Sequence, residues 1–435
     1  MIIQFSVKNY KSFRDKAKLN FLASRYDKDL ENNLVEIPQF QLKVVKSAVF
    51  YGANAAGKSK LMDAMSFMRH FMLRSSADMQ SKDKISIVPF RLNPASEQSP
   101  SEFEIIFLHE GELFRYGFEV TQEKVVSEWL FHRPKTKEIE LFFRDEQNFE
   151  AVHSKLFRIG ARLVKDGMVR QNALLLSVAA QFNDPLALRI FDWLSKFNVI
   201  SGLQEEGYEG FTIGRVMNND GKNVILDFLN AADLGINDVK ILKIEQESDL
   251  PDAMPGRLKE LLIQKMREND GHILGGMKTL HHKYDVNGNQ VGTAEFEMEE
   301  ESSGTQKYFA LSGPIIETLQ SGDTLVVDEL ESKLHPNLVA KIVELFQSPK
   351  TNPHNAQLIF NTHDINLLSS GFLRRDQIWF VQKDRYGASS VYSLADFKTD
   401  QVRKEDNFEK NYVNGKYGAV PYLEDFEEAL TAAVQ

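Results

Sequence analysis

Alternating apolar and polar positions predict strands in the first fifty residues. Ile2 to Val7 alternates, Lys18 to Leu22 is a second candidate, and the apolar run Ala48 to Tyr51 is a third. After a turn rich in glycine and alanine, apolar residues recur at helical spacing from Gly57 to Leu73. The pattern therefore predicts a strand, a tight loop and a helix in succession.

Strand patterns return between Phe103 and Phe143, where the segments EFEIIFL, LFRYGFEV, VVSEWLF and IELFF are separated by short polar breaks. This spacing predicts an antiparallel meander. The apolar run Leu174 to Ala180 also resembles a strand. From Asp184 to Gly276 helical periodicity predicts a helical insertion, with helices at Pro185 to Phe197, Lys222 to Ala232 and Gly256 to Arg267.

The last third of the chain alternates between strands and helices, which favours a parallel sheet. The expected elements are a strand pair around Leu280 to Phe296, a helix Ser303 to Leu319, a strand Thr324 to Val327, a helix Pro336 to Phe346 and a strand Leu358 to Phe360. The patterns together predict an α/β fold with a mixed β-sheet core, an antiparallel β subdomain and a helical insertion. We expect the parts to be residues 1–183, 184–276 and 277–435.

Composition narrows the class of protein. The 435 residues are 42% hydrophobic and 26% charged, as in ordinary globular proteins, and a net charge of -10 disfavours non-specific binding to nucleic acid. Since the chain has no cysteine, disulfides, thiolate metal sites and cysteine nucleophiles are excluded. No apolar stretch approaches the length of a membrane span, and the N-terminus lacks the features of a signal peptide. We therefore expect a cytoplasmic protein without a membrane segment.

The segment Gly52 to Ser59, GANAAGKS, matches the phosphate-binding pattern G-x-x-x-x-G-K-[ST] between a strand and a helix. In such a loop, backbone N–H groups converge on phosphate oxygens and the helix N-terminus adds partial positive charge. Lys58 is expected to reach the β- and γ-phosphates, and Ser59 to bind Mg²⁺. The residues expected to hold the nucleotide here are Gly52, Asn54, Ala55, Ala56, Gly57, Lys58, Ser59 and Lys60.

A second group of candidates follows the apolar strands near the C-terminus. Asp328 ends one strand and is expected to hold Mg²⁺ through its water shell, while Glu329 is the expected base for a water that attacks the γ-phosphate. His363 ends the next strand and can hydrogen-bond the γ-phosphate. Ser303 is the expected N-cap of a helix whose exposed N–H groups favour a phosphate. A guanine nucleotide is not expected, because Phe397 occupies the first position of the nearest candidate for a guanine-reading motif.

In this order, the loop, the helix start, the Asp-Glu strand and the strand-end histidine resemble a P-loop ABC-type ATPase head of the soluble SMC/RecF-like branch. The resemblance implies that the loop is Walker A, that Asp328 and Glu329 form Walker B, and that His363 is the switch histidine. Gln181 is our candidate for the Q-loop glutamine, which links the metal to the helical subdomain. The signature loop is matched by Ser303, Gly304 and Gln306, with Ser302 and Thr305 replacing its leucine and second glycine.

The resemblance also implies cofactors and partners. Such heads bind two ATP molecules between two protomers, so ATP, Mg²⁺ and a homodimer or higher homo-oligomer are expected. A similarity over nearly the whole chain is to the RloA/AbiLi family of compact AAA/ABC-type ATPases of bacterial phage-defence loci. It implies a sensor and gate for a separate effector nuclease of the RloB or Toprim type, triggered by a phage protein or DNA. The segments that carry it are KNYKSF, FYGANAAGKS, PFRL, EWLF, NALLLSVAAQFN, ESSGTQK, DELESKLHP, NTHD and KYGAVP.

Two other functions stay open. A RecF/SMC-like DNA repair or recombination ATPase would grip duplex DNA in a basic groove, but we interpret the basic clusters at Arg69 and Arg74, Arg133 to Lys137 and Arg374-Arg375 as solvated surface charge. A chain that cuts nucleic acid itself would need a fused Toprim domain, for which too few residues follow His363. We interpret the separated acidic residues Asp396, Asp400, Glu405 and Asp406 as a solvated loop, and His281-His282 is not expected to bind a metal.

Overall fold

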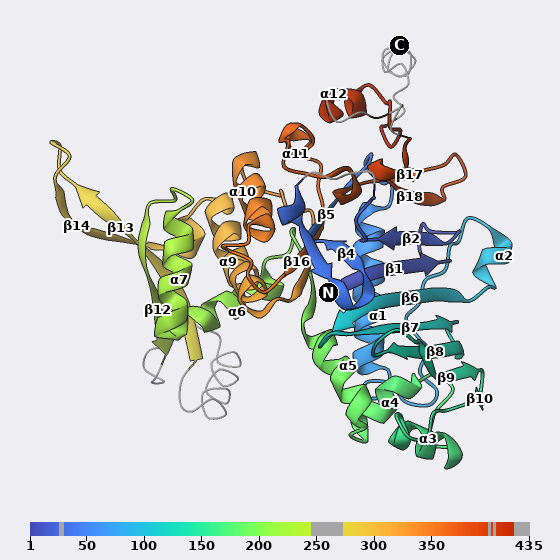
Figure 1. Cartoon of the computed structure of the whole chain (residues 1–435). Coiled ribbons are helices and arrows are strands. Elements are labelled where there is room, and N and C mark those ends of the chain that lie inside the picture. Colours follow the sequence, from blue (N-terminus) through green and yellow to red (C-terminus); the bar gives the residue numbers. More distant parts are fainter. Residues whose placement is uncertain (26–29, 245–272, 399–401, 403–405, 422–435) are drawn as a thin grey trace, which may run out of the picture. The chain divides into compact units, whose positions relative to one another are not determined.

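The computed structural model describes residues 1–25, 30–244, 273–398, 402 and 406–421 (Figure 1). The chain divides into two compact units. The first unit comprises Met1–Leu203, Thr318–Ser332 and Val339–Gln435, and the second comprises Gln204–Glu317 and Lys333–Leu338. The chain therefore leaves the first unit twice and returns to it twice.

The centre of the first unit is a six-stranded sheet in the order β11-β15-β16-β5-β17-β18. The first five strands are parallel, and β18 pairs antiparallel at one edge. All side chains of β5 and β16 are buried, as expected for strands covered on both faces. The parallel sheet predicted from the strand and helix alternation is thus confirmed. Its strands are β5 (Ser47–Tyr51), β11 (Phe197–Ser201), β15 (Thr324–Asp328), β16 (Gln357–Asn361), β17 (Ile378–Lys383) and β18 (Ser389–Ser393).

A seven-stranded antiparallel sheet, in the order β10-β9-β8-β7-β6-β1-β2, contains the predicted meander and adds the two N-terminal strands. Helix α1 (Lys58–Arg74) packs on this sheet, with the rings of Phe71 and Phe118 5.4 Å apart. Val326 and Ile359 of the central sheet belong to the same apolar core cluster. The strands are β1 (Ile2–Lys8), β2 (Ala17–Asn20), β6 (Ser101–His109), β7 (Glu112–Val120), β8 (Val125–Arg133), β9 (Ile139–Asp145) and β10 (Asn148–Glu150).

Two predictions for the middle of the chain are corrected. The run Leu174 to Ala180 is not a strand but helix α4 (Leu175–Gln181), whose residues Leu175 to Ala180 are buried. Helix α5 (Pro185–Ser195) buries Ile190 and Trp193 in the core of the first unit, and β11 follows it into the central sheet. The first boundary between units therefore falls after Leu203, and not at the expected residue 184.

The remaining elements of the first unit connect these layers. They are β3 (Leu34–Ile37), β4 (Leu42–Val45), α2 (Pro94–Glu97), α3 (Arg158–Lys165), α11 (Asn366–Ser369), α12 (Phe408–Val413) and the 3-10 helices η1 (Glu31–Asn33), η2 (Pro38–Phe40), η5 (Arg375–Gln377) and η6 (Leu394–Asp396). None of the helices in the described part of the chain is long and apolar enough to span a membrane.

In the second unit, helices α6 (Glu206–Met217) and α7 (Asn219–Asn230) precede an antiparallel sheet in the order β12-β13-β14. The helix expected at Lys222 to Ala232 is confirmed as α7, and the strand pair around Leu280 to Phe296 is confirmed as β13 and β14. The helix expected at Gly256 to Arg267 lies outside the described residues. The other elements are β12 (Ile236–Ile244), β13 (Ile273–Tyr284), β14 (Gln290–Glu297), η4 (Met298–Glu300), α9 (Ser303–Ser321) and α10 (Pro336–Gln347), of which α9 and α10 extend into the first unit.

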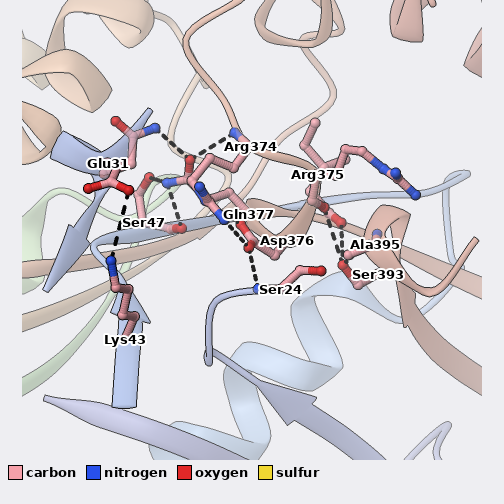
Figure 2. A network of polar contacts seen from close by, with 12 residues as sticks. Ser24, Glu31, Lys43, Ser47, Arg374, Arg375, Asp376, Gln377, Ser393 and Ala395 are labelled. Carbon is pink, nitrogen blue, oxygen red and sulfur yellow. Dashed lines mark hydrogen bonds and ion pairs between the residues drawn. The ribbon is translucent and has the colours of Figure 1, made fainter. Parts of the chain in front are cut away.

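Figure 2 shows polar contacts at the amino-terminal edge of the central sheet. Gln377, next to β17, donates through Nε2 to Ser47 Oγ (2.7 Å) and O (3.1 Å), at the first residue of β5. Arg374 forms a buried ion pair with Asp376 (2.7 Å), which also accepts from Ser24 N (2.7 Å). Because Arg374 is only 1% exposed, its interpretation as solvated surface charge is wrong. These contacts fix the starts of two adjacent strands.

A second buried network explains why α4 is a helix. Glu128 on β8 is fully buried and accepts from Leu175 N (2.7 Å), Leu176 N (3.1 Å) and Tyr116 Oη (2.9 Å). The two backbone groups lie in the first turn of α4, where N–H groups have no partner within the helix. The guanidinium of buried Arg144 lies 3.5 Å from Glu128 Oε2. Burial raises the pKa of Glu128, and these partners oppose that rise.

We predict that Glu128→Ala lowers the free energy of unfolding by about 3–5 kcal/mol, because it leaves two helix N–H groups without their acceptor and a buried guanidinium without its carboxylate. Urea denaturation followed by circular dichroism measures the change. The matched control is Glu138→Ala, whose ion pair with Arg115 is half exposed and should contribute less than about 1 kcal/mol. Equal losses in the two variants would contradict a capping role for Glu128.

Candidate nucleotide-binding site

The phosphate-loop motif connects the central strand β5 to helix α1, as the sequence predicts. Ala55 (φ 61°) and Gly57 (φ 116°) have left-handed backbone conformations, which curl the chain into a tight loop. Lys58, the first residue of α1, donates through Nζ to the carbonyl oxygens of Gly52 (2.8 Å) and Ala53 (3.3 Å). Its ammonium group therefore lies over the loop that would hold the phosphates.

Gly57 is required by space as well as by backbone angle. A Cβ atom at this position would lie 2.5 Å from Ser389 Oγ and 2.8 Å from Ser12 Oγ. Ser389 N donates to Ser12 O (2.7 Å), and Ser389 Oγ donates to Ala56 O (2.6 Å). The loop is thus clamped between β18 and the turn after β1. Ser389 was not singled out from the sequence, and Ser12 appeared there only as part of the segment KNYKSF, without a role at this loop.

The acidic pair at the end of β15 is held by the neighbouring strand. Asn361, the last residue of β16, donates through Nδ2 to Asp328 Oδ1 and accepts from Glu329 N through Oδ1 (2.7 Å). Asn361 is fully buried, and Glu329 has a left-handed backbone with φ 57°. One side chain therefore orients both carboxylate-bearing residues. The sequence placed Asn361 beside the histidine but indicated no role for it.

His363 follows β16 by two residues and is exposed. Its backbone N donates to Glu331 Oε1 (2.6 Å), which ties the histidine turn to the segment after β15. Val327, Phe360 and Val49 are register partners across β15, β16 and β5. The acidic pair, the histidine and the phosphate loop thus emerge at the same carboxyl edge of the sheet.

The phosphate loop, Glu329 and His363 line one open cleft of about 660 Å³, a volume typical of ligand sites. Burial lowers the pKa of Lys58, while the carboxylates of Glu331, Glu329 and Asp328 oppose that fall. Asp328 lies beside the cleft at the strand end and is not among its lining residues. The lining consists of Asn54 to Lys60, Glu329 and His363, together with Lys11, Ser12, Phe90, Leu92, Lys383 and Gly387.

The residues present fit a nucleotide with Mg²⁺. The loop supplies a cradle of backbone N–H groups at a helix N-terminus, and Lys58 supplies a cation. The hydroxyl of Ser59 and the carboxylate of Asp328 are oxygen ligands of the kind that Mg²⁺ prefers. Within the residues that the structure describes, no group of three or more His, Cys, Asp or Glu side chains is placed to hold a metal by itself. A Mg²⁺ here would depend on the phosphates for part of its coordination.

The expected signature residues Ser303, Gly304 and Gln306 belong to the second unit, at the start of α9. Ser302, and not Ser303 as predicted, caps this helix, because Ser302 Oγ accepts from Thr305 N (3.1 Å). Ser303 is exposed in the first turn, next to the cap. Its hydroxyl is thus not used as the helix cap.

Other residues of the second unit support the signature loop. A Cβ atom on Gly304 would lie 2.8 Å from Lys333 O, so the glycine permits close backbone approach. Lys333 has φ 63°, and its Nζ forms an ion pair with Glu205 (2.9 Å). Burial raises the pKa of Glu205, but its bond to Lys333 contributes to a net lowering. The signature loop, Lys333 and Glu205 therefore form one connected group.

The candidate Q-loop glutamine is not among the residues that line the cleft. Gln181 is exposed at the end of α4 and is absent from the cleft lining. A different glutamine, Gln204, follows β11 by three residues, and Ser201 at the end of β11 is the register partner of Asp328. Strand β11, which the sequence patterns did not identify, therefore ends next to Asp328 of β15.

Comparison with known proteins gives a family. A family model described as "AAA domain, putative AbiEii toxin, Type IV TA system" matches residues 47–369, which include the phosphate loop, the signature residues, the acidic pair and His363. This match confirms the resemblance to compact AAA/ABC-type ATPases inferred from the motifs. No curated protein sequence matches the chain.

Similar solved structures include a crystal structure of the SmcHead bound to the C-winged helix domain of ScpA, with 14% identity and a TM-score of 0.38. The match covers 92% of this chain and 99% of that chain. A structure of the recombination mediator protein RecF with ATP, in the RecFOR pathway, has 15% identity and a TM-score of 0.30. It covers 83% of this chain and 93% of that one.

We predict that Gly57→Ala weakens binding of Mg-ATP by more than about tenfold, because the new Cβ pushes against two serines and strains a left-handed backbone. Isothermal titration calorimetry measures the affinity. Gly111→Ala is the matched control: Gly111 also has a positive φ, of 76°, but a Cβ there meets nothing within 4 Å. If both variants bind equally, the clamp on the loop does not govern binding.

Proposed function

The chain belongs to this AAA-domain family, and from that membership we propose that it binds and hydrolyses ATP in the cleft around Lys58. In this proposal ATP and Mg²⁺ join two copies through composite sites, and the nucleotide state regulates a separate effector nuclease in antiphage, abortive-infection defence. One observation carries the proposal. Lys58, Glu329 and His363 line a single cleft at the carboxyl ends of neighbouring strands.

Each residue of the cleft has a separate task in this reaction. Lys58 donates to loop carbonyls, and the phosphate oxygens of ATP compete for the same ammonium protons. Glu329 accepts the proton of the attacking water, since its position after β15 is fixed by the bond between its N–H group and Asn361. The imidazole of His363 donates to a γ-phosphate oxygen and loses this partner when phosphate leaves. Bound Mg²⁺ would neutralise negative charge on the phosphates of ATP.

The proposed dimer follows from the chemistry of the second unit. Ser303 is exposed in the first turn of α9, where backbone N–H groups attract anions. A γ-phosphate held by Walker A of one copy and by Ser303 of another makes ATP a ligand of the dimer. Hydrolysis then removes the shared anion and weakens the association.

A protein effector is favoured over duplex DNA by the fate of the basic clusters. Arg374 is paired with Asp376 in the core, and Arg69 donates through Nε to Leu194 O (3.1 Å). Burial also lowers the pKa of Arg69. One arginine in each of two of the three clusters is therefore engaged by the protein itself, while Arg74 is exposed. We propose an effector of the RloB or Toprim-like class, with a phage protein or DNA as the trigger.

The first experiment measures the molecular mass of Glu329→Gln by light scattering, with and without ATP and Mg²⁺. Blocking the base traps bound ATP, so we expect ATP to double the mass of this variant. Adding Lys58→Ala removes binding, and adding Ser303→Arg blocks the composite site, so neither double variant should change mass. Ser195→Arg, at an exposed serine at the end of α5, is the matched control and should dimerise normally.

Three outcomes separate the parts of the proposal. A constant mass with ATP bound contradicts the composite dimer but leaves nucleotide binding intact. Failure of the unaltered protein to bind ATP contradicts the proposed function itself. ATP-dependent binding of duplex DNA that weakens steeply with salt would favour the DNA repair alternative.

A further inference from the structure

One wall of the cleft carries a large apolar side chain that faces solvent. Leu92 is 71% exposed and lines the cleft, whereas its neighbour Phe90, also in the lining, is only 1% exposed. Most other lining positions are polar residues or belong to the phosphate loop. A leucine at the rim of a polar cleft offers apolar surface to a ligand without a need to rearrange the core.

The wall continues into the turn between β17 and β18. A Cβ atom on Gly387 would lie 2.3 Å from Leu92 Cδ1, so the leucine packs directly on the backbone of this turn. Asp384 holds the turn, because its Oδ1 accepts from Tyr386 N and from Ala388 N, each at 2.8 Å. The surface that Leu92 and Gly387 form is therefore preorganised.

The same turn is tied to the phosphate loop. Ser389, which begins β18, donates to Ala56 O and to Ser12 O. On the other side, Phe90 N donates to Asn9 Oδ1 (3.1 Å), which fixes the segment before Leu92 to the turn after β1. The apolar wall and the phosphate loop are thus connected by one network of hydrogen bonds.

The polarity of the cleft sets the direction of a bound nucleotide. Glu329 and His363 must lie at the γ-phosphate, since the base and the imidazole act there. The loop Asn54 to Lys60 holds the phosphate chain. The rest of the lining consists of the polar residues Lys11, Ser12 and Lys383, the buried Phe90, and the wall of Leu92 and Gly387. Within this remainder Leu92 supplies the exposed apolar surface, and the part of a nucleoside triphosphate that has an apolar face is its base.

We propose that Leu92 and the β17–β18 turn at Gly387 form the nucleobase subsite of the cleft, against which the base of ATP packs by its face. This inference rests on the proposed function, because it concerns the same ligand. The base then covers the exposed side chain of Leu92. Because the contacts to the base and the contacts to the phosphates involve different residues, their contributions to the binding free energy are expected to add.

The test compares ATP with inorganic tripolyphosphate, which has the phosphates but no base. Leu92→Ala should weaken ATP binding about tenfold, equivalent to about 1.4 kcal/mol, and leave tripolyphosphate unchanged. Leu92→Met keeps the apolar volume and should bind ATP normally. Tyr386→Ala is the matched control, because Tyr386 lies in the same turn and is 60% exposed but does not line the cleft. Since Leu92 is exposed, none of these variants should unfold the protein.

A second measurement follows the environment of the base through its fluorescence. The triphosphate of 2-aminopurine riboside should change its fluorescence on binding to the unaltered protein and to Tyr386→Ala, but less on binding to Leu92→Ala at saturation. The subsite is contradicted if Leu92→Ala leaves the ATP affinity unchanged, weakens ATP and tripolyphosphate equally, or leaves the fluorescence change intact. Lys58→Ala separates the two hypotheses: if it does not weaken ATP binding, the proposed function fails, whatever Leu92 does.

Discussion

The register of three parallel strands controls the geometry of the cleft. The apolar faces of β5, β15 and β16 are all buried and carry little information about register, because one buried aliphatic side chain can replace another. Polar side chains at the opposite edge supply that information. Gln357 at the start of β16 exchanges hydrogen bonds with the backbone of Ile2, and Gln377 bonds to Ser47 at the start of β5 (Figure 2). A buried amide has one favourable position, since leaving it unpaired costs about 1–3 kcal/mol. The polar contacts at the amino-terminal ends of the strands thus set the register, and the register sets the positions of the functional residues at the carboxyl-terminal ends.

The parts of the site that sequence predicts are those whose chemistry is local. Lys58, Ser59 and the curled loop follow from eight consecutive residues, and Asp328, Glu329 and His363 follow from strands that end in polar groups. The supports of these residues were not predictable, because they come from distant segments. Asn361, Ser389 and Leu92 act through contacts with residues far away along the chain, and no periodicity marks them. Which residues hold the functional side chains in place depends on the three-dimensional fold. A local sequence pattern does not contain this information.

The corrections have physical causes of the same kind. An apolar run of seven residues is compatible with a strand or a buried helix, and α4 is a helix because Glu128, from another strand, satisfies its first N–H groups. Strand β11 was missed because it follows α5 after a single residue and is only partly buried. Ser302 and Ser303 are both good caps, and only the bond to Thr305 decides between them. Arg374 shows that a charged residue need not be exposed to solvent, because its guanidinium is buried in an ion pair with Asp376.

The order of strands in the central sheet bears on how the protein is made. β5 precedes the phosphate loop, but its neighbours in the sheet are β16 and β17, which follow it by about 300 residues, so the closing of this sheet carries a large entropic cost. During synthesis at roughly 5–20 residues per second, β5 emerges from the ribosome roughly 15–60 s before either partner. In that interval a strand whose five side chains are all buried in the folded protein has no partner strand. The nascent chain must keep it from aggregating until the second unit and the last strands have been translated.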